Sequence, residues 1–281
     1  VTPEGLRYDG RRIGELRKIS IEINNVPDAD GSCIFTLGNT KVLATVYGPN
    51  DLLRVKNPLQ ASISVEYNVA PYAGNERRLP ASSQPQVGQI ANNTCKEYSI
   101  ELKKLFDSVI MLHKWPNSSI QISVTVLSDQ GSAFSTSINA ITVALMMAGI
   151  DMIDLVTAST CCIYDNQPLI DVTSREAGLL GGLTTLAVFN MRGYRDNATG
   201  LIEDEIKQEL TENGSIIVDD KPKKQLPPTK KIALLHHTQK TLLNKLQLSL
   251  DAGNYACTII HDLIKQTVRQ YMIDQVVSKQ Q

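Results

Sequence analysis

Alternating apolar and polar residues in the first part of the chain predict β-strands. The alternation is regular in four runs, at residues 18–24, 31–39, 41–48 and 61–70. Side chains of a strand point to its two faces in turn, so a period of two gives each strand one apolar face. Gly38 and Asn39, between the second and third runs, are typical of a tight hairpin turn. We therefore expect four strands, of which the second and third form a hairpin.

Later in the chain, apolar residues recur every three or four positions, which predicts helices. This spacing is found at residues 97–113, and further helices are expected at 133–148, 238–252 and 255–276. The helix at 133–148 carries many small residues that allow close packing, and Gly149 is a suitable C-cap. Further strand-like runs lie at residues 119–127, 154–171, 182–190 and 232–237. Because strands and helices are partly segregated along the chain, this order favours an α+β fold over a doubly wound sheet.

Two segments lack a pattern that would bury an apolar face. Residues 71–94 are rich in Pro, Gly, Ser, Gln and Asn, so we expect a long exposed loop. Residues 193–230 carry an acidic stretch and then a basic, proline-containing run, so we expect a flexible, solvated insertion. The basic run could bind RNA or a partner, but solvation is the favoured interpretation. The sequence thus predicts a single domain, residues 1–281, that contains this loop and this insertion.

The overall composition excludes some classes of protein. Hydrophobic residues make up 42% of the chain and charged residues 20%, which is ordinary for a globular protein. The net charge of -1 does not indicate a nucleic-acid binder, so any basic surface must be local. Without an apolar run of membrane-spanning length or a signal-peptide pattern, an intracellular protein is expected. The 5 cysteines form no CxxC pair and the 4 histidines lie at no ligand spacing, so we expect neither a metal nor a cofactor.

Residues 128–139 (SDQGSAFSTSIN) have the pattern of a loop that begins a helix. Asp129, Gly131 and Ser132 precede the small-residue helix. Exposed backbone N–H groups at a helix start attract anions, so this arrangement is typical of a phosphate site. A phosphate-binding loop would be expected to add a positive side chain, but Ala133 and Phe134 follow instead. The sequence predicts the backbone of a phosphate loop without its cation.

Several stretches taken together resemble the RNase PH family, in which they occur in the same order. They are GLRYDGRRIGELRKISIEI (5–23), DADGSCIFTLGNTKVLATVYGP (28–49), TVLSDQGS (125–132), INAITVALMMAGIDMIDL (138–155) and PLIDVT (168–173). The resemblance implies an RNase PH-like fold, also described as ribosomal protein S5 domain 2-like, with mixed sheets packed against helices. It also implies a ring of six such subunits with RNA threaded through the centre. Catalytic members use inorganic phosphate to cleave the terminal RNA phosphodiester and release nucleoside diphosphates.

Two positions depart from the pattern of the active relatives. Their loop reads Asp-Gly-Gly-Thr-Arg or Asp-Ala-Gly-Ser-Arg, whereas residues 129–133 here end in Ala133. Of two aspartates six positions apart, Asp171 matches the first and Ala177 stands at the second. Glu176 is adjacent, but on an extended segment it would point the other way. One such catalytic group contributes roughly 10²- to 10⁴-fold in rate, so we expect a chain that is not an enzyme. Gly131 and Ser132 would then be a vestigial phosphate loop.

The resemblance also implies that basic side chains line the path of the RNA. A positive surface binds the RNA backbone without reading its sequence. Arg77 and Arg78 resemble the paired arginines of the family's channel-facing loop, and Lys96 competes with them for the same role. Arg54 and Lys56 resemble basic residues near the channel mouth. We predict these five as the RNA-binding residues.

Other conspicuous polar residues receive structural interpretations. Arg11 and Arg12, in the first matched stretch, are expected to pair with acidic residues and fix the N-terminal arm or a subunit contact. His236 and His237 lie in no plausible ligand set and are expected to be structural. Without a partner aspartate, Asp171 is expected to serve as a turn or capping carboxylate.

The resemblance leads to two main hypotheses about function. The favoured one is a non-catalytic ring subunit of the RNA exosome core, which lines a channel for single-stranded RNA in rRNA processing and RNA degradation, mRNA decay included. Its partners would be other RNase PH-like subunits in a hetero-hexameric ring, S1/KH-type cap subunits and a hydrolytic 3′→5′ exoribonuclease, in the nucleus, nucleolus and cytoplasm. The alternative is an active phosphate-dependent 3′→5′ exoribonuclease. A third reading is a self-assembled ring that only binds RNA.

Overall fold

A computed structural model describes most of the chain. The described residues are 6–51, 59–73, 85–164, 167–180, 182–190, 230–238 and 242–278. They form two β-sheets and the helices packed against them, which confirms the predicted α+β class. The predicted insertion, residues 193–230, lies outside the described residues except for Lys230, which begins a strand.

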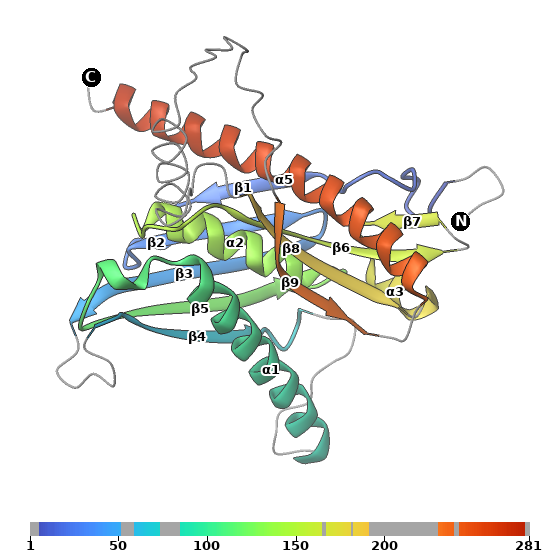
Figure 1. The fold of residues 1–281 in the computed structure, drawn as a ribbon, viewed down its shortest axis with the longest axis horizontal. Helices are drawn as coiled ribbons and strands as arrows, with labels where there is room; N and C mark the ends of the chain where they lie inside the picture. The colour runs from blue at the N-terminus through green and yellow to red at the C-terminus, as the bar shows by residue number, and fades with distance from the viewer. Residues whose placement is uncertain are drawn as a thin grey trace, which may run out of the picture.

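The first sheet contains five strands and is built from the N-terminal half of the chain (Figure 1). Neighbouring strands are antiparallel, except for the parallel pair formed by the last two in the sheet. In spatial order the strands are β1 (Ile19–Ile23), β2 (Gly31–Leu37), β3 (Thr40–Asp51), β5 (Ser118–Ser128) and β4 (Ser62–Val69). The predicted hairpin turn is present, with Gly38 in the left-handed region at φ 60°.

The period of two in the sequence separates the two faces of this sheet. On β2 and β5, Cys33, Phe35 and Ile122 have no exposed surface. Alternate positions on β5 and on the neighbouring β3 carry residues such as Gln121 and Lys41, which are exposed. An antiparallel sheet with one face on the core and one toward solvent shows this alternation, so the strand pattern was readable in the sequence.

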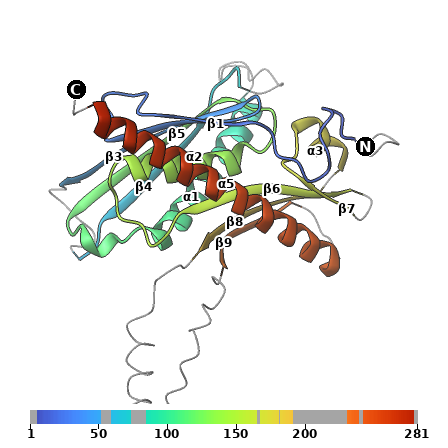
Figure 2. The same ribbon diagram turned by 90° about the horizontal axis from the view of Figure 1, so that it is seen from above.

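Helix α2 (Ala133–Met147) lies between the two sheets and forms the centre of the core (Figure 2). Every residue from Phe134 to Leu145 is buried. Its buried polar side chains are satisfied: Asn139 exchanges two hydrogen bonds with the backbone of Ala158, at 2.9 and 2.8 Å. The small residues of this helix therefore serve close packing, as the sequence predicted.

The second sheet has four strands and is covered on both faces. Its order is β7 (Gln167–Ile170), β6 (Val156–Tyr164), β8 (Leu183–Asn190) and β9 (Lys230–His237). On β6, Thr160 donates to Ser135 of α2 at 3.0 Å, whereas Ser159 donates to the Gly253 carbonyl of α5 (Leu243–Ser278) at 3.1 Å. Helices on both faces explain why the first seven residues of β6 are all buried.

The C-terminal region forms one long helix, α5, where the sequence predicted two helices at 238–252 and 255–276. Gly253, which falls between the two predicted helices, lies inside α5 where the helix touches the second sheet. A Cβ added there would come within 2.9 Å of a methyl group of Leu186. The glycine therefore allows close approach of helix and sheet, a tertiary role that the local pattern does not reveal.

Helix α1 (Pro85–Val109) also differs from its prediction. It begins twelve residues before position 97, so residues 85–94 of the predicted loop at 71–94 are helical. Of the rest of this predicted loop, residues 74–84 lie outside the described part of the chain. The buried face of α1 includes Leu102, Phe106 and Val109, which have no exposed surface, and the helix packs against β4. A short 3-10 turn, Leu112–Lys114, leads on to β5.

The N-terminal arm, residues 6–18, lies beside β7 and the short helix α3 (Ser174–Leu180) (Figures 1 and 2). Arginines of the arm reach the backbone and side chains of residues 170–176, as detailed below. Among the described residues, no helix is long and apolar enough to cross a membrane. Within the same residues, no group of three or more His, Cys, Asp or Glu side chains could hold a metal ion.

Candidate functional site

The loop between β5 and α2 has a specific backbone shape that the sequence anticipated. The Asp129 carboxylate accepts a hydrogen bond from the Gly131 N–H at 2.8 Å. Gly131 and Ser132 both have positive φ, at 104° and 62°. The Ser132 hydroxyl donates to the Val172 carbonyl at 2.9 Å and makes no capping bond to α2. Ser132 therefore ties the loop to the segment before α3.

An aromatic cluster occupies the space beside the first turn of α2. The rings of Phe134 and Tyr98 stack with centroids 4.6 Å apart, and His236 of β9 lies edge-on to both, at 6.2 and 6.3 Å. Tyr67 of β4 makes a further edge contact with Tyr98 at 5.5 Å. This structural role of His236 agrees with its interpretation from the sequence. These four residues define the aromatic cluster. Through Phe134 it lies at the start of α2, where a phosphate loop would be expected to carry a positive side chain.

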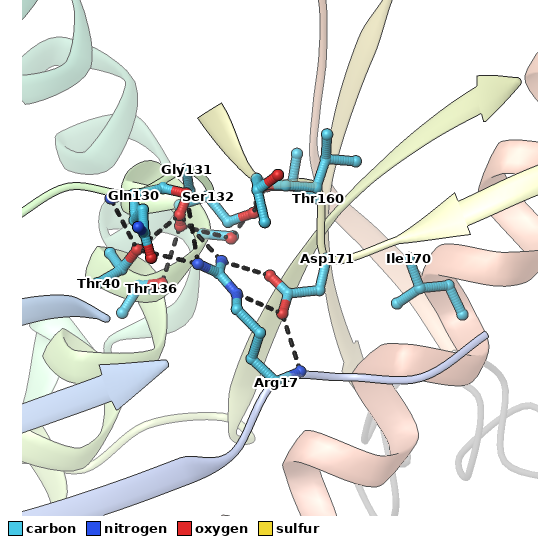
Figure 3. Close-up of polar contacts among 12 residues, drawn as sticks. Arg17, Thr40, Gln130, Gly131, Ser132, Thr136, Thr160, Ile170 and Asp171 are labelled. Carbon is cyan, nitrogen blue, oxygen red and sulfur yellow. Dashed lines mark hydrogen bonds and ion pairs between the residues drawn. The ribbon is translucent and has the colours of Figure 1, made fainter. Parts of the chain in front are cut away.

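An arginine of the N-terminal arm holds the other side of the loop (Figure 3). Arg17 makes a bidentate ion pair with Asp171, with Nε–Oδ2 at 2.7 Å and a second guanidinium nitrogen 2.6 Å from Oδ1. The same guanidinium donates to the Gly131 carbonyl at 3.0 Å. Arg17 is 9% exposed and Asp171 2%, so this pair lies in the interior. Thr40 adds a bond to the Gly131 carbonyl at 2.8 Å.

A second arginine of the arm pairs with α3. The fully buried Arg7 side chain binds both carboxylate oxygens of Glu176, with Nε–Oε1 at 2.8 Å, and donates to the Ile170 and Asp171 carbonyls. Glu176 also accepts hydrogen bonds from the backbone N–H and the hydroxyl of Thr173, both at 2.9 Å. The bond from the Thr173 N–H is the return half of a capping box, which fixes the start of α3.

The interpretation of Asp171 as a turn or capping carboxylate was wrong. Its backbone has the left-handed conformation of a turn, at φ 55°, but its carboxylate is an ion-pair partner. Besides Arg17, Arg11 reaches it at 3.3 Å. Arg11 also binds Asp9 at 2.6 Å, so its predicted pairing with acidic residues is observed. The two guanidinium groups compensate the negative charge of Asp171, and this offsets the cost of burying the carboxylate.

Position 177 also has a different setting from the one expected. Residues 174–180 form helix α3, so the prediction that Glu176 lies on an extended segment was wrong. The Ala177 side chain packs beside the buried cluster of Cys162, Leu169 and Val172. The Glu176 carboxylate forms an ion pair with Arg7. The carboxylate next to position 177 therefore binds an arginine of the N-terminal arm.

Acid should weaken the attachment of the arm, because both carboxylates have lowered pKa values. Burial alone would raise the pKa of Glu176, but hydrogen bonds from Arg7 and Thr173 and the charge of Arg7 lower it to about 2 from 4.5. Burial would likewise raise the pKa of Asp171, but the hydrogen bonds and the charge of Arg17 lower it. A carboxylate whose pKa is lower in the folded than in the unfolded chain stabilises the fold at pH values above its unfolded pKa. This stabilisation is lost as the pH falls from the unfolded pKa to the folded one.

We therefore expect the free energy of unfolding to fall between about pH 4.5 and pH 2. Urea unfolding followed by circular dichroism at several pH values measures this slope. In Glu176→Gln the slope should be shallower and the stability at neutral pH lower. Glu97→Gln, at an exposed position on α1, is the control and should retain the full slope. Equal slopes for the Glu176→Gln variant and the unmodified chain would contradict the assignment.

Among the predicted RNA-binding residues, only Lys96 belongs to the described residues. Arg54, Lys56, Arg77 and Arg78 lie outside them. Lys96 is exposed on α1 and lines a cavity of about 470 Å³ between this helix and β4. It precedes Tyr98 of the aromatic cluster by two positions, so the two side chains point to different faces of α1.

Sequence reasoning did not single out Arg7 or Arg17, and it did not pair Glu176 with Arg7. Both arginines belong to the arginine-rich first stretch of the resemblance, and this is the signal that could have singled them out. Their partners lie 169 and 154 positions away along the chain. Only the folded chain brings these charges together, so spacing alone could not pair them.

Comparisons with known proteins agree with this architecture. Residues 15–151 match the 3′ exoribonuclease family, domain 1. The exosome complex component RRP41 homolog of Arabidopsis thaliana is 35% identical over 191 residues, covering 67% of this chain and 76% of the relative. Archaeoglobus fulgidus Rrp41 is 32% identical over 224 residues, covering 76% and 83%. A solved A. fulgidus exosome with RNA bound to the active site has a chain of the same fold, with TM-score 0.62, 17% identity and 92% coverage of both chains.

The chain belongs to the RNase PH family of 3′ exoribonucleases. Within that family, its relatives in plants, animals, yeast and archaea place it with the RRP41 type of exosome subunit. The RNase PH-like fold inferred from the ordered motifs is confirmed by the solved exosome structure.

The expectation that the chain is not an enzyme is contradicted by these comparisons. It rested on Ala133 and Ala177 alone. The matched family is one of exoribonucleases, and the archaeal Rrp41 shares about a third of its aligned residues with this chain. A solved exosome of the same fold has RNA at its active site. Substitution at two positions is therefore not a sufficient ground for placing the chain outside the enzymes of its family.

Proposed function

We propose that this protein is a ring subunit of an RNA exosome and that it lines the path of single-stranded RNA. Its neighbours would be other RNase PH-like subunits, with S1/KH-type subunits capping the ring and a hydrolytic 3′→5′ exoribonuclease associated with it. The processes served would be rRNA processing and RNA degradation, in the nucleus, nucleolus and cytoplasm. Membership of the RRP41 type supports the assembly, and the archaeal exosome with bound RNA supports the ligand.

The observation that carries the proposal is the position of Lys96. This exposed cation lies on α1 and lines the cavity of about 470 Å³ between this helix and β4. A cation attracts the phosphates of a single strand, and the cavity beside Lys96 gives the strand a surface to lie against. The combination suits binding of single-stranded RNA without preference for its sequence.

Removing this cation should weaken RNA binding and make it less sensitive to salt. In the assembled ring, Lys96→Ala is expected to reduce the slope of log affinity against log salt by about 0.7, the effect of one phosphate contact on a single strand. Fluorescence anisotropy of a labelled oligoadenylate at several salt concentrations measures both quantities. Addition of inorganic phosphate to the same samples tests for release of nucleoside diphosphates, which would assign phosphorolysis to the ring.

The control is Lys104→Ala, also an exposed lysine of α1, about 12 Å further along the helix. It should leave the affinity and the salt slope unchanged. Wild-type values in the ring that carries Lys96→Ala would exclude Lys96 from the RNA path.

A further inference from the structure

A cavity of about 330 Å³ lies beside the N-terminal arm, on the side of the loop that Arg17 holds. Four segments distant in sequence form its walls: the arm, the β2–β3 turn, the loop before α2, and the start of α3. The side chains that matter for its chemistry are Tyr8, Arg17, Asn39, Gln130, Ser174 and Arg175. Lys96, the predicted RNA-binding residue that the structure describes, does not line it, and its volume is at the lower end for small-molecule sites.

The mouth of this cavity carries an aromatic ring paired with a cation. Tyr8 is 77% exposed, and the Arg175 guanidinium lies over its ring, 5.0 Å from the centroid. The ring is therefore accessible to a ligand from the solvent side. Arg175 leaves one face of Tyr8 for a second flat group, because a ring has two faces.

The charges around the cavity leave one cation uncompensated. Asp171 neutralises Arg17, and Asp9 is paired with Arg11. Arg175 contacts the Tyr8 ring but forms no ion pair within the described part of the chain. A ligand that brings a negative charge would therefore be attracted to the mouth, next to the exposed ring.

Two polar side chains of the walls lack partners. The Ser174 hydroxyl oxygen is buried and has no hydrogen bond within the described residues. The Gln130 side chain is exposed, and its amide has no protein partner among those residues either. A buried hydroxyl without a partner is destabilising, so a group that supplies the hydrogen bond gains affinity. The glutamine thus adds a donor and an acceptor to this cavity.

We propose that this cavity binds one ribonucleotide, with the base stacked on Tyr8 and the phosphate on Arg175. Ser174 and Gln130 then supply hydrogen bonds to the sugar or the base edge. The inference deepens the proposed function and rests on it, since RNA is the polymer that would present such a unit. A ribonucleotide fits better than an acidic peptide because it satisfies both the ring and the cation with one rigid group.

Binding of two probes to the purified full chain tests the proposal. The probes are ADP, followed by calorimetry, and a short fluorescein-labelled oligoadenylate, followed by anisotropy. Tyr8→Ala should weaken binding of both about tenfold, the usual loss when one stacking ring is removed, whereas Tyr8→Phe should bind like the wild type. Arg175→Glu should give a similar loss. Because Tyr8 and Arg175 are exposed, none of these changes should affect thermal unfolding.

The two probes also distinguish the source of the ribonucleotide. Equal affinity for both indicates a free nucleotide, and tighter binding of the oligoadenylate indicates a strand of RNA. Tyr255→Ala, which removes another exposed tyrosine on α5, is the matched control and should bind both probes normally.

Three results would overturn the proposal. They are absence of binding to both probes, wild-type affinity in Tyr8→Ala, and loss of a subunit from the ring in Tyr8→Ala with nucleotide affinity unchanged. The last result would assign the cavity to a partner protein. Failure here is distinguishable from failure of the proposed function, because the Lys96 titration reports on RNA binding by the ring independently of this cavity.

Discussion

Replacing Arg17 by alanine should lower the free energy of unfolding by about 3–5 kcal/mol, the loss typical when one partner of a buried ion pair is removed. The change leaves the Asp171 carboxylate, 2% exposed, without its bidentate partner. It also removes the hydrogen bond to the Gly131 carbonyl, so the loop before α2 loses one of its supports. Urea unfolding of the full chain, followed by circular dichroism, measures the difference.

The neighbouring lysine provides a matched control for Arg17. Lys18 is exposed, so Lys18→Ala should change the free energy of unfolding by less than about 0.5 kcal/mol. The double variant Arg17→Ala/Asp171→Ala should be more stable than the sum of the two single losses predicts, because neither charge is then left alone. Additive losses would contradict a direct interaction between the two side chains.

A methyl group at Gly131 should be nearly as damaging. Gly131 has φ 104°, which side chains rarely adopt, and this strain costs about 1–3 kcal/mol. Its Cβ would also lie 2.5 Å from the Ser174 backbone nitrogen and 2.6 Å from the Val172 carbonyl oxygen, so the backbone must move apart. Adding the overpacking, we expect Gly131→Ala to lose about 4 kcal/mol of unfolding free energy in total.

Gly149 separates the two contributions at Gly131. It also has positive φ, at 70°, but a Cβ there would meet nothing within 4 Å. Gly149→Ala should therefore show the conformational strain alone, about 1–2 kcal/mol. Thermal unfolding of the two variants in parallel compares them. Equal losses would mean that the close approach of the loop to the α3 segment contributes nothing to stability.

The loop before α2 shows how far sequence reasoning can be taken at one site. Its turn, its glycine and its small-residue helix were all readable, because each depends on neighbours within a few positions. Its partners were not readable. Ser132 is bonded to Val172, and the Gly131 carbonyl to Arg17 and Thr40, all supplied by distant segments.

Absence of a residue type proved a weaker guide than presence of a motif. The ordered motifs correctly indicated the family and the fold, because many positions support them together. The inference of inactivity used Ala133 and Ala177 alone, and the family comparisons contradict it. The motifs describe a shared scaffold, whereas activity depends on which groups the assembled site brings near the substrate.

The sequence by itself determined the α+β class, most strands of both sheets and the central helix α2. These follow from periodicities of two and of three to four residues, which are local properties of the chain. The tertiary structure decided the rest: the continuity of α5 through Gly253, the pairing of Arg17 with Asp171 and of Arg7 with Glu176, and the cavity beside Tyr8. Each of these depends on contacts between residues far apart in sequence, because packing and burial set their energies and the local pattern carries no record of them.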